Sequence, residues 1–383
     1  MTLAIVLIVL VSAGLAYANG ANDVSKGIAT LVGSGVTDYR RAILWGSLWT
    51  GAGGVLGAVF AGAMLTTFGS GLLAGGASPT FLAALAALAG AASWVVLATR
   101  AGLPVSTTHA IIGSLIGVAM PAYGAGAVQW AGLGGKVVLP LLLTPLLSLV
   151  LTSVILRATR ARAGAGSAAA DCLCAELSPS LVALGTGGAT ASPTLDAARP
   201  QLRITSARAE TCATERPQAL RVTLGHLHWL TSGATSLARG MNDAPKIVAL
   251  SLAASALGAT TAMPTPVLYT VVTVAMVAGS LVAGLRVTRV LAEEVTPMDD
   301  REGFTANLVT AALVTAGAVH GLPMSTTHVA SGGIFGAGAQ RGTLDRRLLR
   351  NILLAWVVTL PAAALLGAGC YAAAAGLGGW WRP

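Results

Sequence analysis

The sequence is poor in charged residues, aromatic residues and cysteine. Asp, Glu, Lys and Arg make up only 10% of its 383 residues, Phe, Trp and Tyr make up 5%, and there are four cysteines. A soluble domain carries about 25% charged residues, so a soluble chain of this length would expose extensive apolar surface. Four cysteines also do not make a disulfide framework. These shortages exclude an ordinary water-soluble domain.

Apolar and small residues are abundant instead. Hydrophobic residues reach 55%, the mean hydropathy is +0.76, and there are 48 glycines. Small residues allow helix backbones to approach one another closely within a lipid bilayer. The composition therefore predicts an all-α polytopic membrane protein. The first apolar stretch lacks a basic n-region, so we interpret it as a retained helix and not as a cleaved signal.

The formal net charge of +9 raises the question of a nucleic-acid partner. Proteins that bind nucleic acid cluster Lys and Arg on one solvated face. Here the basic residues stand at the ends of apolar segments, which is typical of cytoplasmic loops. We therefore expect the chain to be embedded in a lipid bilayer and not to bind nucleic acid.

Two motifs occur twice in the same order. The segment at 20–26, Gly-Ala-Asn-Asp-Val-Ser-Lys, returns at 240–246 as Gly-Met-Asn-Asp-Ala-Pro-Lys, an offset of 220 residues. The segment at 102–109, Gly-Leu-Pro-Val-Ser-Thr-Thr-His, returns at 321–328 as Gly-Leu-Pro-Met-Ser-Thr-Thr-His, an offset of 219. Two motifs at nearly one offset indicate an internal duplication.

The duplication predicts three parts: a first membrane repeat at 1–157, a linker at 158–220 and a second membrane repeat at 221–383. The linker contains no apolar run of the roughly 20 residues needed to cross a bilayer. From the sequence it is either a disordered linker or a small soluble module.

Three of the four cysteines, Cys172, Cys174 and Cys212, lie in the linker. A zinc site built from them together with His226 or His228 is conceivable, although the spacings fit no standard zinc pattern. We therefore expect no resident metal apart from a coupling Na⁺.

Charges in equivalent loops indicate how the repeats are oriented. The loop at 37–41 contains Asp and two Arg, whereas its counterpart at 257–266 is uncharged. The loop at 65–80 is uncharged, whereas its counterpart at 285–303 carries several Arg and acids. Basic loops face the cytoplasm. The repeats are therefore predicted to be inverted in a bacterial-type inner (plasma) membrane, with the linker cytoplasmic and both termini outside.

Each repeat is expected to make five net crossings, about ten in all. The motifs interrupt apolar runs, so the helices around 19–23, 102–108, 239–245 and 321–327 are predicted to be broken or re-entrant. Inverted repeats with discontinuous helices are typical of secondary transporters, which bind their substrate near the midplane. The predicted apolar segments are 1–18, 42–64, 80–99, 103–120, 137–156, 222–238, 265–285, 304–320, 322–338 and 350–375.

Asp23 and Asp243 occupy equivalent positions in the two repeats and lie in apolar surroundings, whereas the other 12 of the 14 acidic residues fall in loops or the linker. An ionisable residue within a bilayer is a candidate functional residue. The alternative is a structural ion pair with Lys26 or Lys246, three residues further along each helix. We favour function, because Asn precedes and Gly flanks both acids.

Two kinds of cation suit these carboxylates. Asp23 and Asp243, the amide oxygens of Asn22 and Asn242, and carbonyls freed by a broken helix would form an oxygen cage for Na⁺. A desolvated carboxylate could instead carry a proton. Arg239, four residues before Asp243, either neutralises that acid or meets an anionic substrate.

The two Ser-Thr-Thr-His motifs predict an anion site. Three hydroxyl residues after a proline, at a break in an apolar run, place donors beside the unpaired N–H groups of a helix N-terminus. The alternative is that these hydroxyls bond back to their own helix. His109 and His328 could contact the anion, titrate or cap a helix. The predicted anion-binding residues are Ser106, Thr107, Thr108, Ser325, Thr326 and Thr327.

A hydrolase is the main enzymatic alternative, because Ser, His and Asp are all present. No Gly-x-Ser-x-Gly elbow, Walker motif or His-Glu-x-x-His occurs in the sequence. Symmetric duplication of the polar residues also suits transport better than catalysis. We expect a transporter with no organic cofactor. Among membrane transport proteins, the alternative is a passive anion channel, which needs no coupling ion.

The paired Asn-Asp segments and the paired Pro-x-Ser-Thr-Thr-His motifs together resemble the inorganic phosphate transporter (PiT) family. The resemblance covers both halves. It implies an inverted-repeat fold and symport of inorganic phosphate with Na⁺ or H⁺. It also implies that the Asn-Asp pairs serve the coupling cation and that the six Ser and Thr residues hold phosphate.

The chain departs from the family pattern at Lys26 and Lys246, where many members have Asn, and at Arg239, which adds a charge. A fixed lysine could stand in for a coupling cation. Some relatives carry sulfate, which has the same tetrahedral shape, so a sulfate or related oxyanion permease is the alternative substrate class. A homodimer is left open by the sequence.

Overall fold

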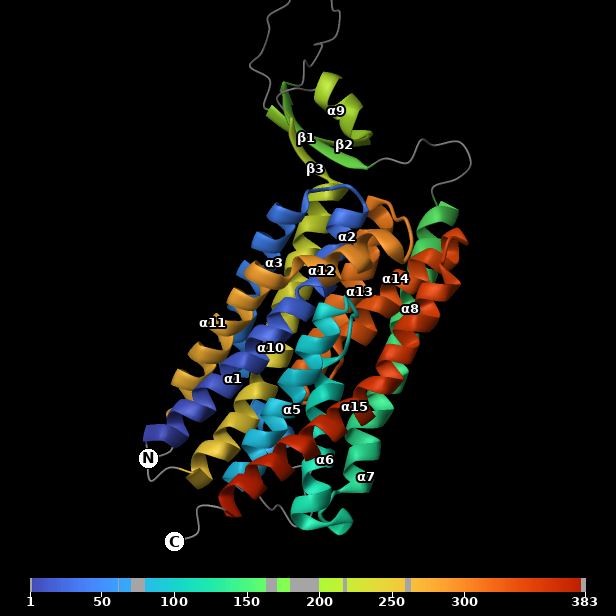
Figure 1. The fold of residues 1–383 in the computed structure, drawn as a ribbon. Coiled ribbons are helices and arrows are strands. Elements are labelled where there is room, and N and C mark those ends of the chain that lie inside the picture. The colour runs from blue at the N-terminus through green and yellow to red at the C-terminus, as the bar shows by residue number, and fades with distance from the viewer. Residues whose placement is uncertain are drawn as a thin grey trace, which may run out of the picture. The chain divides into compact units, whose positions relative to one another are not determined.

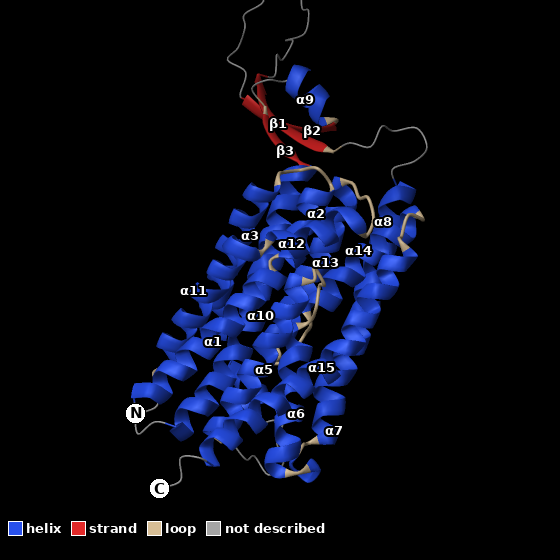
Figure 2. Ribbon diagram, viewed as in Figure 1, coloured by secondary structure: helices blue, strands red, loops and turns tan. Residues whose placement is uncertain are grey.

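The computed structural model describes residues 2–60, 62–69, 80–162, 171–179, 200–215, 219–258 and 263–379. The chain forms two compact units: residues 1–157 together with 228–383, here called the membrane unit, and residues 158–227, here called the linker module. Figure 1 shows the membrane unit as a long helical bundle, and Figure 2 shows that the strands belong to the linker module.

Helices account for nearly all of the described membrane unit. In the first half they are α1 (Thr2–Asp23), α2 (Ser25–Gly33), α3 (Tyr39–Phe60), α4 (Gly62–Gly69), α5 (Phe81–Arg100), α6 (Thr107–Tyr123), the 3-10 turn η2 (Ala125–Ala127), α7 (Trp130–Leu133), the π turn η3 (Gly134–Val138) and α8 (Leu139–Arg162). In the second half they are α10 (Leu224–Gly258), α11 (Thr265–Ala283), α12 (Leu285–Arg289), the π turn η4 (Val290–Glu294), α13 (Asp300–Val319), α14 (Thr326–Arg341) and α15 (Arg346–Gly379).

Seven helical segments among the described residues are long and apolar enough to cross a membrane. Helices of this kind satisfy their own backbone polar groups, which is what a bilayer requires. The chain is therefore a multi-pass membrane protein, as the composition predicted. The candidate spans are Leu3–Gly33, Tyr39–Phe60, Phe81–Arg100, Leu139–Arg160, Thr265–Ala283, Asp300–Val319 and Arg346–Gly376.

Two of the four predicted helix breaks are present. Residues 101–106 separate α5 from α6, and residues 320–325 separate α13 from α14. The break predicted at 239–245 is wrong, because α10 runs without interruption from Leu224 to Gly258. The break predicted around 19–23 lies one residue later: α1 continues to Asp23, and a single residue, Val24, separates it from α2.

The glycines of these two motifs serve helix packing and not a break. A Cβ at Gly20 would lie 2.0 Å from the carbonyl oxygen of Met276, and one at Gly240 would lie 2.3 Å from that of Thr50. Each glycine therefore lets α1 or α10 touch the backbone of a helix in the other half. The glycines of the Asn-Asp motifs were interpreted from sequence as helix breaks, whereas in the structure they allow close approach between helices.

The helix contacts between the halves are reciprocal. Gly20 packs on Met276 and Gly279 on Tyr17, which joins α1 to α11. The corresponding contacts, Gly240 on Thr50 and Gly53 on Leu237, join α10 to α3. A second set of glycine contacts between the halves follows the same pattern. Helix α6 packs on α15 through Gly113 on Leu360 and Gly117 on Ala364. Helix α14 packs on α8 through Gly332 on Pro145 and Gly336 on Leu149.

Helices α1 and α10, which carry the two Asn-Asp motifs, run in opposite directions. The hydroxyls of Ser12 and Ser251 lie 2.6 Å apart, and Ser232 donates to the carbonyl of Gly27 at 2.7 Å. The middle of α1 thus lies beside the C-terminal part of α10, and α2, which follows α1, lies beside the N-terminal part of α10. Figure 1 shows the same antiparallel course of α1 and α10.

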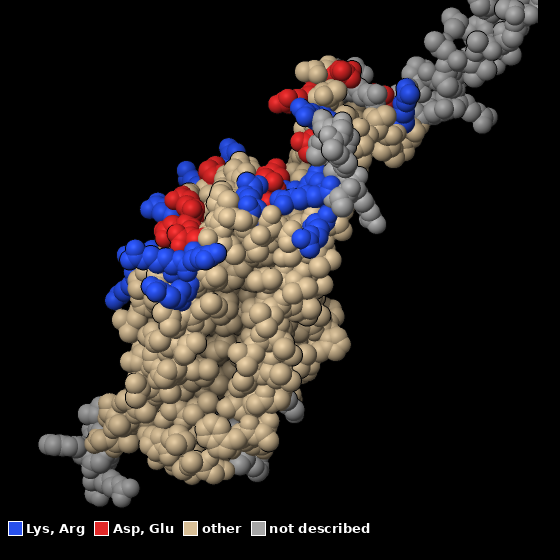
Figure 3. All heavy atoms as spheres, turned by 90° about the vertical axis from the view of Figure 1, so that its right-hand side faces the viewer, with Lys and Arg blue, Asp and Glu red and all other residues tan. Residues whose placement is uncertain are grey.

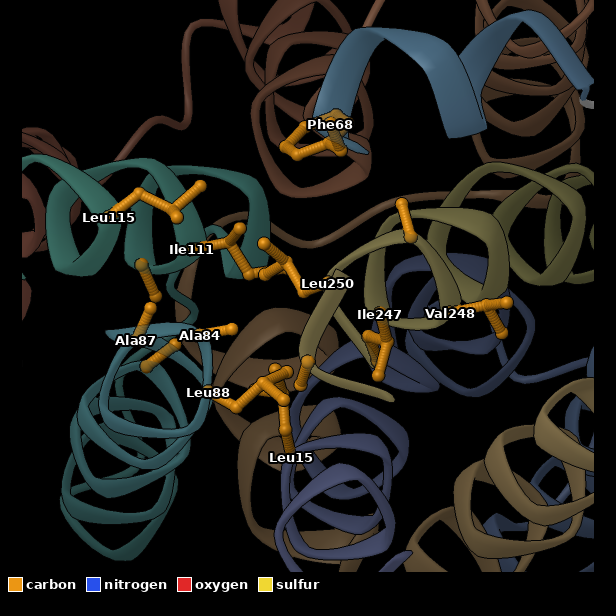
Figure 4. Close-up of a cluster of buried hydrophobic side chains, with 14 of the residues drawn as sticks. Leu15, Phe68, Ala84, Ala87, Leu88, Ile111, Leu115, Ile247, Val248 and Leu250 are labelled. Carbon is orange, nitrogen blue, oxygen red and sulfur yellow. The ribbon is translucent and has the colours of Figure 1, made fainter. Parts of the chain in front are cut away.

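A large apolar cluster fills one part of the bundle (Figure 4). It brings together side chains from α1, α4, α5, α6 and α10, including Leu15, Phe68, Leu88, Ile111 and Leu250. Large apolar side chains also remain exposed along the outer helices, for example Leu48 (65%) and Leu142 (63%). In a bilayer these outer positions contact lipid.

The linker module contains a three-stranded antiparallel sheet in the order β2-β1-β3, with strands β1 (Cys172–Pro179), β2 (Pro200–Ala207) and β3 (Leu220–Thr223). One short helix, α9 (Ala209–Glu215), contacts β1 and β3. The central strand pairs Cys172 with Ala207 on one side and with Thr223 on the other.

The reciprocal contacts predict that Gly20→Ala destabilises the protein. Its methyl group would collide with the backbone of Met276, and overpacking of this kind costs about 1–3 kcal/mol. Gly14→Ala in the same helix is the matched control, because nothing lies within 4 Å of its Cβ. Thermal unfolding in detergent should show a lower Tm for Gly20→Ala only; equal Tm values for both variants would contradict the helix contact.

Candidate functional site

The two Ser-Thr-Thr-His motifs form matching helix starts. Ser106 precedes α6, and its Oγ accepts a hydrogen bond from the backbone N–H of His109 at 3.2 Å. Ser325 precedes α14, and its Oγ accepts from the N–H of His328 at 3.3 Å. A serine in this position satisfies one of the free N–H groups at a helix N-terminus. Each motif therefore begins its helix after a non-helical loop, with both serines buried.

These two loops come together from opposite halves. Thr108 Oγ1 donates to the carbonyl of Met324 at 3.3 Å, and Thr327 Oγ1 donates to the carbonyl of Val105 at 2.7 Å. Four of the six predicted phosphate-binding hydroxyls are thus engaged in caps or in bonds between the loops. The alternative, in which the hydroxyls bond to their own helix, holds for the two capping serines and not for Thr108 and Thr327.

The two motif histidines stack on each other beside the loops. The rings of His109 and His328 lie 4.6 Å apart with an angle of 10° between their planes, and Trp356 of α15 stacks on His328 at 3.8 Å. Ser325 Oγ lies 2.6 Å from His328 Nδ1. His109 Nδ1 is buried and has no hydrogen-bond partner among the described residues.

The first Asn-Asp motif surrounds the ammonium group of Lys26 with oxygen. Lys26 Nζ donates to the carbonyl of Asn22 at 2.8 Å, to Asn22 Oδ1 at 2.6 Å and to Asp23 Oδ1 at 2.8 Å. Asn22 also ties the motif to the loop before α6: its Nδ2 donates to Leu103 O, and its Oδ1 accepts from the N–H of Val105. All of these contacts lie within one half, and Asn22, Asp23 and Lys26 are buried.

The second Asn-Asp motif uses its lysine differently. Lys246 Nζ donates to Asp243 Oδ1 at 3.1 Å, to Thr108 Oγ1 at 2.7 Å and to Met324 O at 2.9 Å. It therefore reaches both motif loops, one from each half. Asn242 Nδ2 contacts Asp243 and Met324, whereas Asn242 Oδ1 has no partner among the described residues.

Asn19 joins the two motifs, and sequence reasoning gave it no role. Its Nδ2 donates to Asp23 Oδ2 at 2.9 Å, to Thr107 Oγ1 at 3.0 Å and to Asp243 Oδ2 at 3.2 Å. Thr107 Oγ1 also donates to Asp23 Oδ2 at 3.3 Å. The signal that could have found Asn19 is its position, since it lies one turn before Asp23 and is the repeat counterpart of Arg239.

Arg239 is the largest of the fully buried side chains, with 1% of its surface exposed. Its Nη2 donates to Thr50 Oγ1 at 2.8 Å and contacts Ser280 Oγ at 3.5 Å. Its Nε and Nη1 have no hydrogen-bond partner among the residues that the structure describes. A buried guanidinium with unpaired donors is costly, so this side chain is suited to receive an anion.

Five charged side chains thus share one buried region, each at most 2% exposed. Lys26, Lys246 and Arg239 contribute three positive charges, and Asp23 and Asp243 contribute two negative charges, which leaves a formal charge of +1. The two i,i+3 ion pairs considered from sequence are both present, at 2.8 Å and 3.1 Å. They account for two of the three cations and leave Arg239 in excess.

A family model described as the phosphate transporter family matches residues 19–367 of this chain. The chain is 29% identical to a Pyrococcus horikoshii protein named as a phosphate permease, over 94% of this chain and 95% of that one. It is 28% identical to an inorganic phosphate transporter of Arabidopsis chloroplasts, over 92% of this chain and 69% of that one.

One solved structure, described as "The sodium-dependent phosphate transporter", has the same fold. Its TM-score is 0.76, with 21% sequence identity, and the likeness covers 98% of this chain and 99% of that chain. The match of the family model extends over both halves and includes the Asn-Asp and Ser-Thr-Thr-His motifs. This chain belongs to the phosphate transporter family.

Proposed function

We propose that this protein is a carrier, not an enzyme, that takes up inorganic phosphate together with a coupling cation across a bacterial-type inner membrane. The observation that carries the proposal is the buried Arg239 side chain, which adds one formal positive charge beyond the two ion pairs and leaves Nε and Nη1 without a partner among the described residues. Its Nη2 donates to Thr50 of the other half. An oxyanion would neutralise that charge. The names of the relatives, phosphate permease and inorganic phosphate transporter, agree with this substrate.

The proposed roles follow from which polar atoms are free. Arg239 Nε and Nη1 would donate to phosphate, together with hydroxyls of Ser106, Thr107, Thr108, Ser325, Thr326 and Thr327 that exchange their present partners on binding. Phosphate keeps a proton at neutral pH and sulfate does not. An acceptor is needed for that proton, and the carboxylates of Asp23 and Asp243 or the unpaired Oδ1 of Asn242 would supply it.

We further propose that the repeats, 1–157 and 221–383, are inverted in the membrane, with the linker cytoplasmic and the termini outside. Supporting this, the charged loops of the two halves meet: the Tyr39 hydroxyl donates to Glu293, and Arg289 lies over the Tyr39 ring at 5.9 Å. Charged side chains also gather toward one end of the membrane unit in Figure 3, above a long uncharged belt.

The coupling cation is proposed to be a proton and not Na⁺. Na⁺ would need the oxygen atoms that flank Asp23 and Asp243. In this chain Lys26 already contacts three oxygens of the first motif, on Asn22 and Asp23. Lys246 contacts Asp243 Oδ1 together with Thr108 Oγ1 and Met324 O. A tethered ammonium supplies the positive charge that a mobile Na⁺ would bring. The sodium dependence named for the structural neighbour belongs to that protein.

The substrate assignment predicts that reconstituted vesicles accumulate labelled phosphate against its gradient when the external pH is lower than the internal pH. A proton ionophore should abolish the accumulation. Sulfate should compete roughly 5- to 150-fold less well than unlabelled phosphate, because a buried acceptor left without its proton costs about 1–3 kcal/mol. Equal competition by sulfate would support the oxyanion permease instead, and uptake that only follows the phosphate gradient would support a channel.

The proposed role of the carboxylates predicts that Asp23→Asn and Asp243→Asn each abolish proton-coupled uptake. An amide keeps one acceptor oxygen, which can serve the neighbouring lysine, but its NH2 group cannot accept from Asn19 and the side chain cannot carry a proton. The matched control is Asp38→Asn, at an acid whose ion pair with Arg41 is exposed to solvent. All three variants should reach the membrane in equal amounts. Normal accumulation by both buried variants would show that these acids are structural.

The tethered-cation proposal predicts that the double variant Lys26→Asn, Lys246→Asn gains Na⁺ dependence. Removing the two ammonium groups frees oxygen atoms that Na⁺ can bind. The control is the pair Lys26→Arg, Lys246→Arg, which keeps both charges. Uptake, and the Tm of the purified protein as a second measurement, should rise with Na⁺ only in the Asn variant. A wild type that requires Na⁺, or an Asn variant with a Na⁺-independent Tm, would contradict the proposal.

A further inference from the structure

Three cysteine side chains converge inside the linker module. Cys172 and Cys174 are two residues apart on β1 and therefore point to the same face of the sheet. Cys212 comes from α9, which contacts that strand. The three sulfur atoms lie within 4.8 Å of one another, and each residue is at most 3% exposed.

The interior of the linker module is formed mainly by the three cysteine side chains and not by large apolar side chains. The buried cluster of the described module consists of the three cysteines and Ala219, with only Ala207 and Ala209 packed against it. The larger apolar side chains face away and are exposed, from 38% at Val222 to 71% at Leu220. So few buried apolar atoms cannot hold α9 on the sheet, and small domains of this kind use a disulfide or a metal ion.

The structure joins Cys174 and Cys212 in a disulfide, which leaves Cys172 as a third buried thiol beside them. In the proposed orientation the module lies in the cytoplasm, where thiols are kept reduced. A disulfide would use two of the three sulfurs, whereas a metal ion uses all three. The side chains are also suitably placed, because thiolates around one tetrahedral Zn²⁺, with Zn–S bonds of about 2.3 Å, lie roughly 4 Å apart.

We propose that the reduced linker module binds one thiophilic metal ion of the Zn²⁺ class through Cys172, Cys174 and Cys212. Binding releases the thiol protons and forms three metal–sulfur bonds, with no change in oxidation state. The ion would fix α9 to the middle strand of the sheet. Its fourth position would take a water molecule or a small ligand.

The histidines considered with these cysteines from sequence have other partners. His228 belongs to the membrane unit, where its Nε2 lies 3.0 Å from Thr30 Oγ1, so it is not part of the proposed donor set. His226 Nδ1 accepts from the N–H of Thr223 at 3.2 Å. The proposed donor set is therefore sulfur alone, which favours thiophilic ions over Mg²⁺ or Ca²⁺.

The test uses the full chain, purified in detergent, treated with a dithiol reductant and freed of it. Co²⁺ serves as the probe, because thiolate coordination gives it a strong near-ultraviolet absorption band. We expect one equivalent of Co²⁺ per chain, displaced by one equivalent of Zn²⁺. Cys172→Ser, Cys174→Ser and Cys212→Ser should each lose the band or weaken Co²⁺ binding at least tenfold, and Cys370→Ser, on α15, should bind as the wild type does.

The Cys172→Ser variant separates the metal site from a disulfide. A disulfide between Cys174 and Cys212 would survive this change, whereas a three-thiolate site would not. Wild-type Co²⁺ binding by Cys172→Ser, or no binding by the reduced wild type, would overturn the proposal. Protease resistance of the module, measured with and without Zn²⁺, checks that each Ser variant folds, and phosphate uptake measured in parallel keeps this result independent of the transport proposal.

Discussion

The whole membrane unit is organised around the cost of burying five charges between two helical repeats. Removing a single partner from a buried ion pair costs about 3–5 kcal/mol, so the halves must hold carboxylates and cations in fixed register. Asn19 performs part of this task by donating to both carboxylates at once. Arg239 forms no ion pair of its own among the described residues, so the region keeps one formal positive charge.

The glycine contacts explain how this register is held. Helix backbones at Gly20 and Gly240 approach the other half so closely that no side chain fits between them. The axial position of Asp23 and Asp243, three residues further along each helix, is fixed as a result. The same contacts at Gly113 and Gly332 set the height of α6 and α14, whose first turns carry the hydroxyl motifs. Close packing of small residues thus positions the polar site.

Much of this could be predicted from the sequence, and the errors have a common cause. Apolar run lengths located most helices, and the duplicated motifs identified the carboxylates and both loop-to-helix transitions. The continuous course of α10 through Gly240 could not be predicted, because a glycine needed for packing and one needed for a break look alike in one sequence. The bridging role of Asn19 and the reach of Lys246 to Thr108 depend on which helices become neighbours, and only the fold determines that.

Duplication supplies two equivalent sites, and single differences between the halves give them different tasks. Lys26 is bonded within its own motif, whereas Lys246 also contacts Thr108 and Met324, which belong to the hydroxyl motifs of the two halves. Arg239 and Asn19 are counterparts, yet one adds a cation and the other links two acids. The repeated framework therefore carries different charges in its two halves: both carboxylates accept three hydrogen bonds, and only the second half adds the unpaired guanidinium of Arg239.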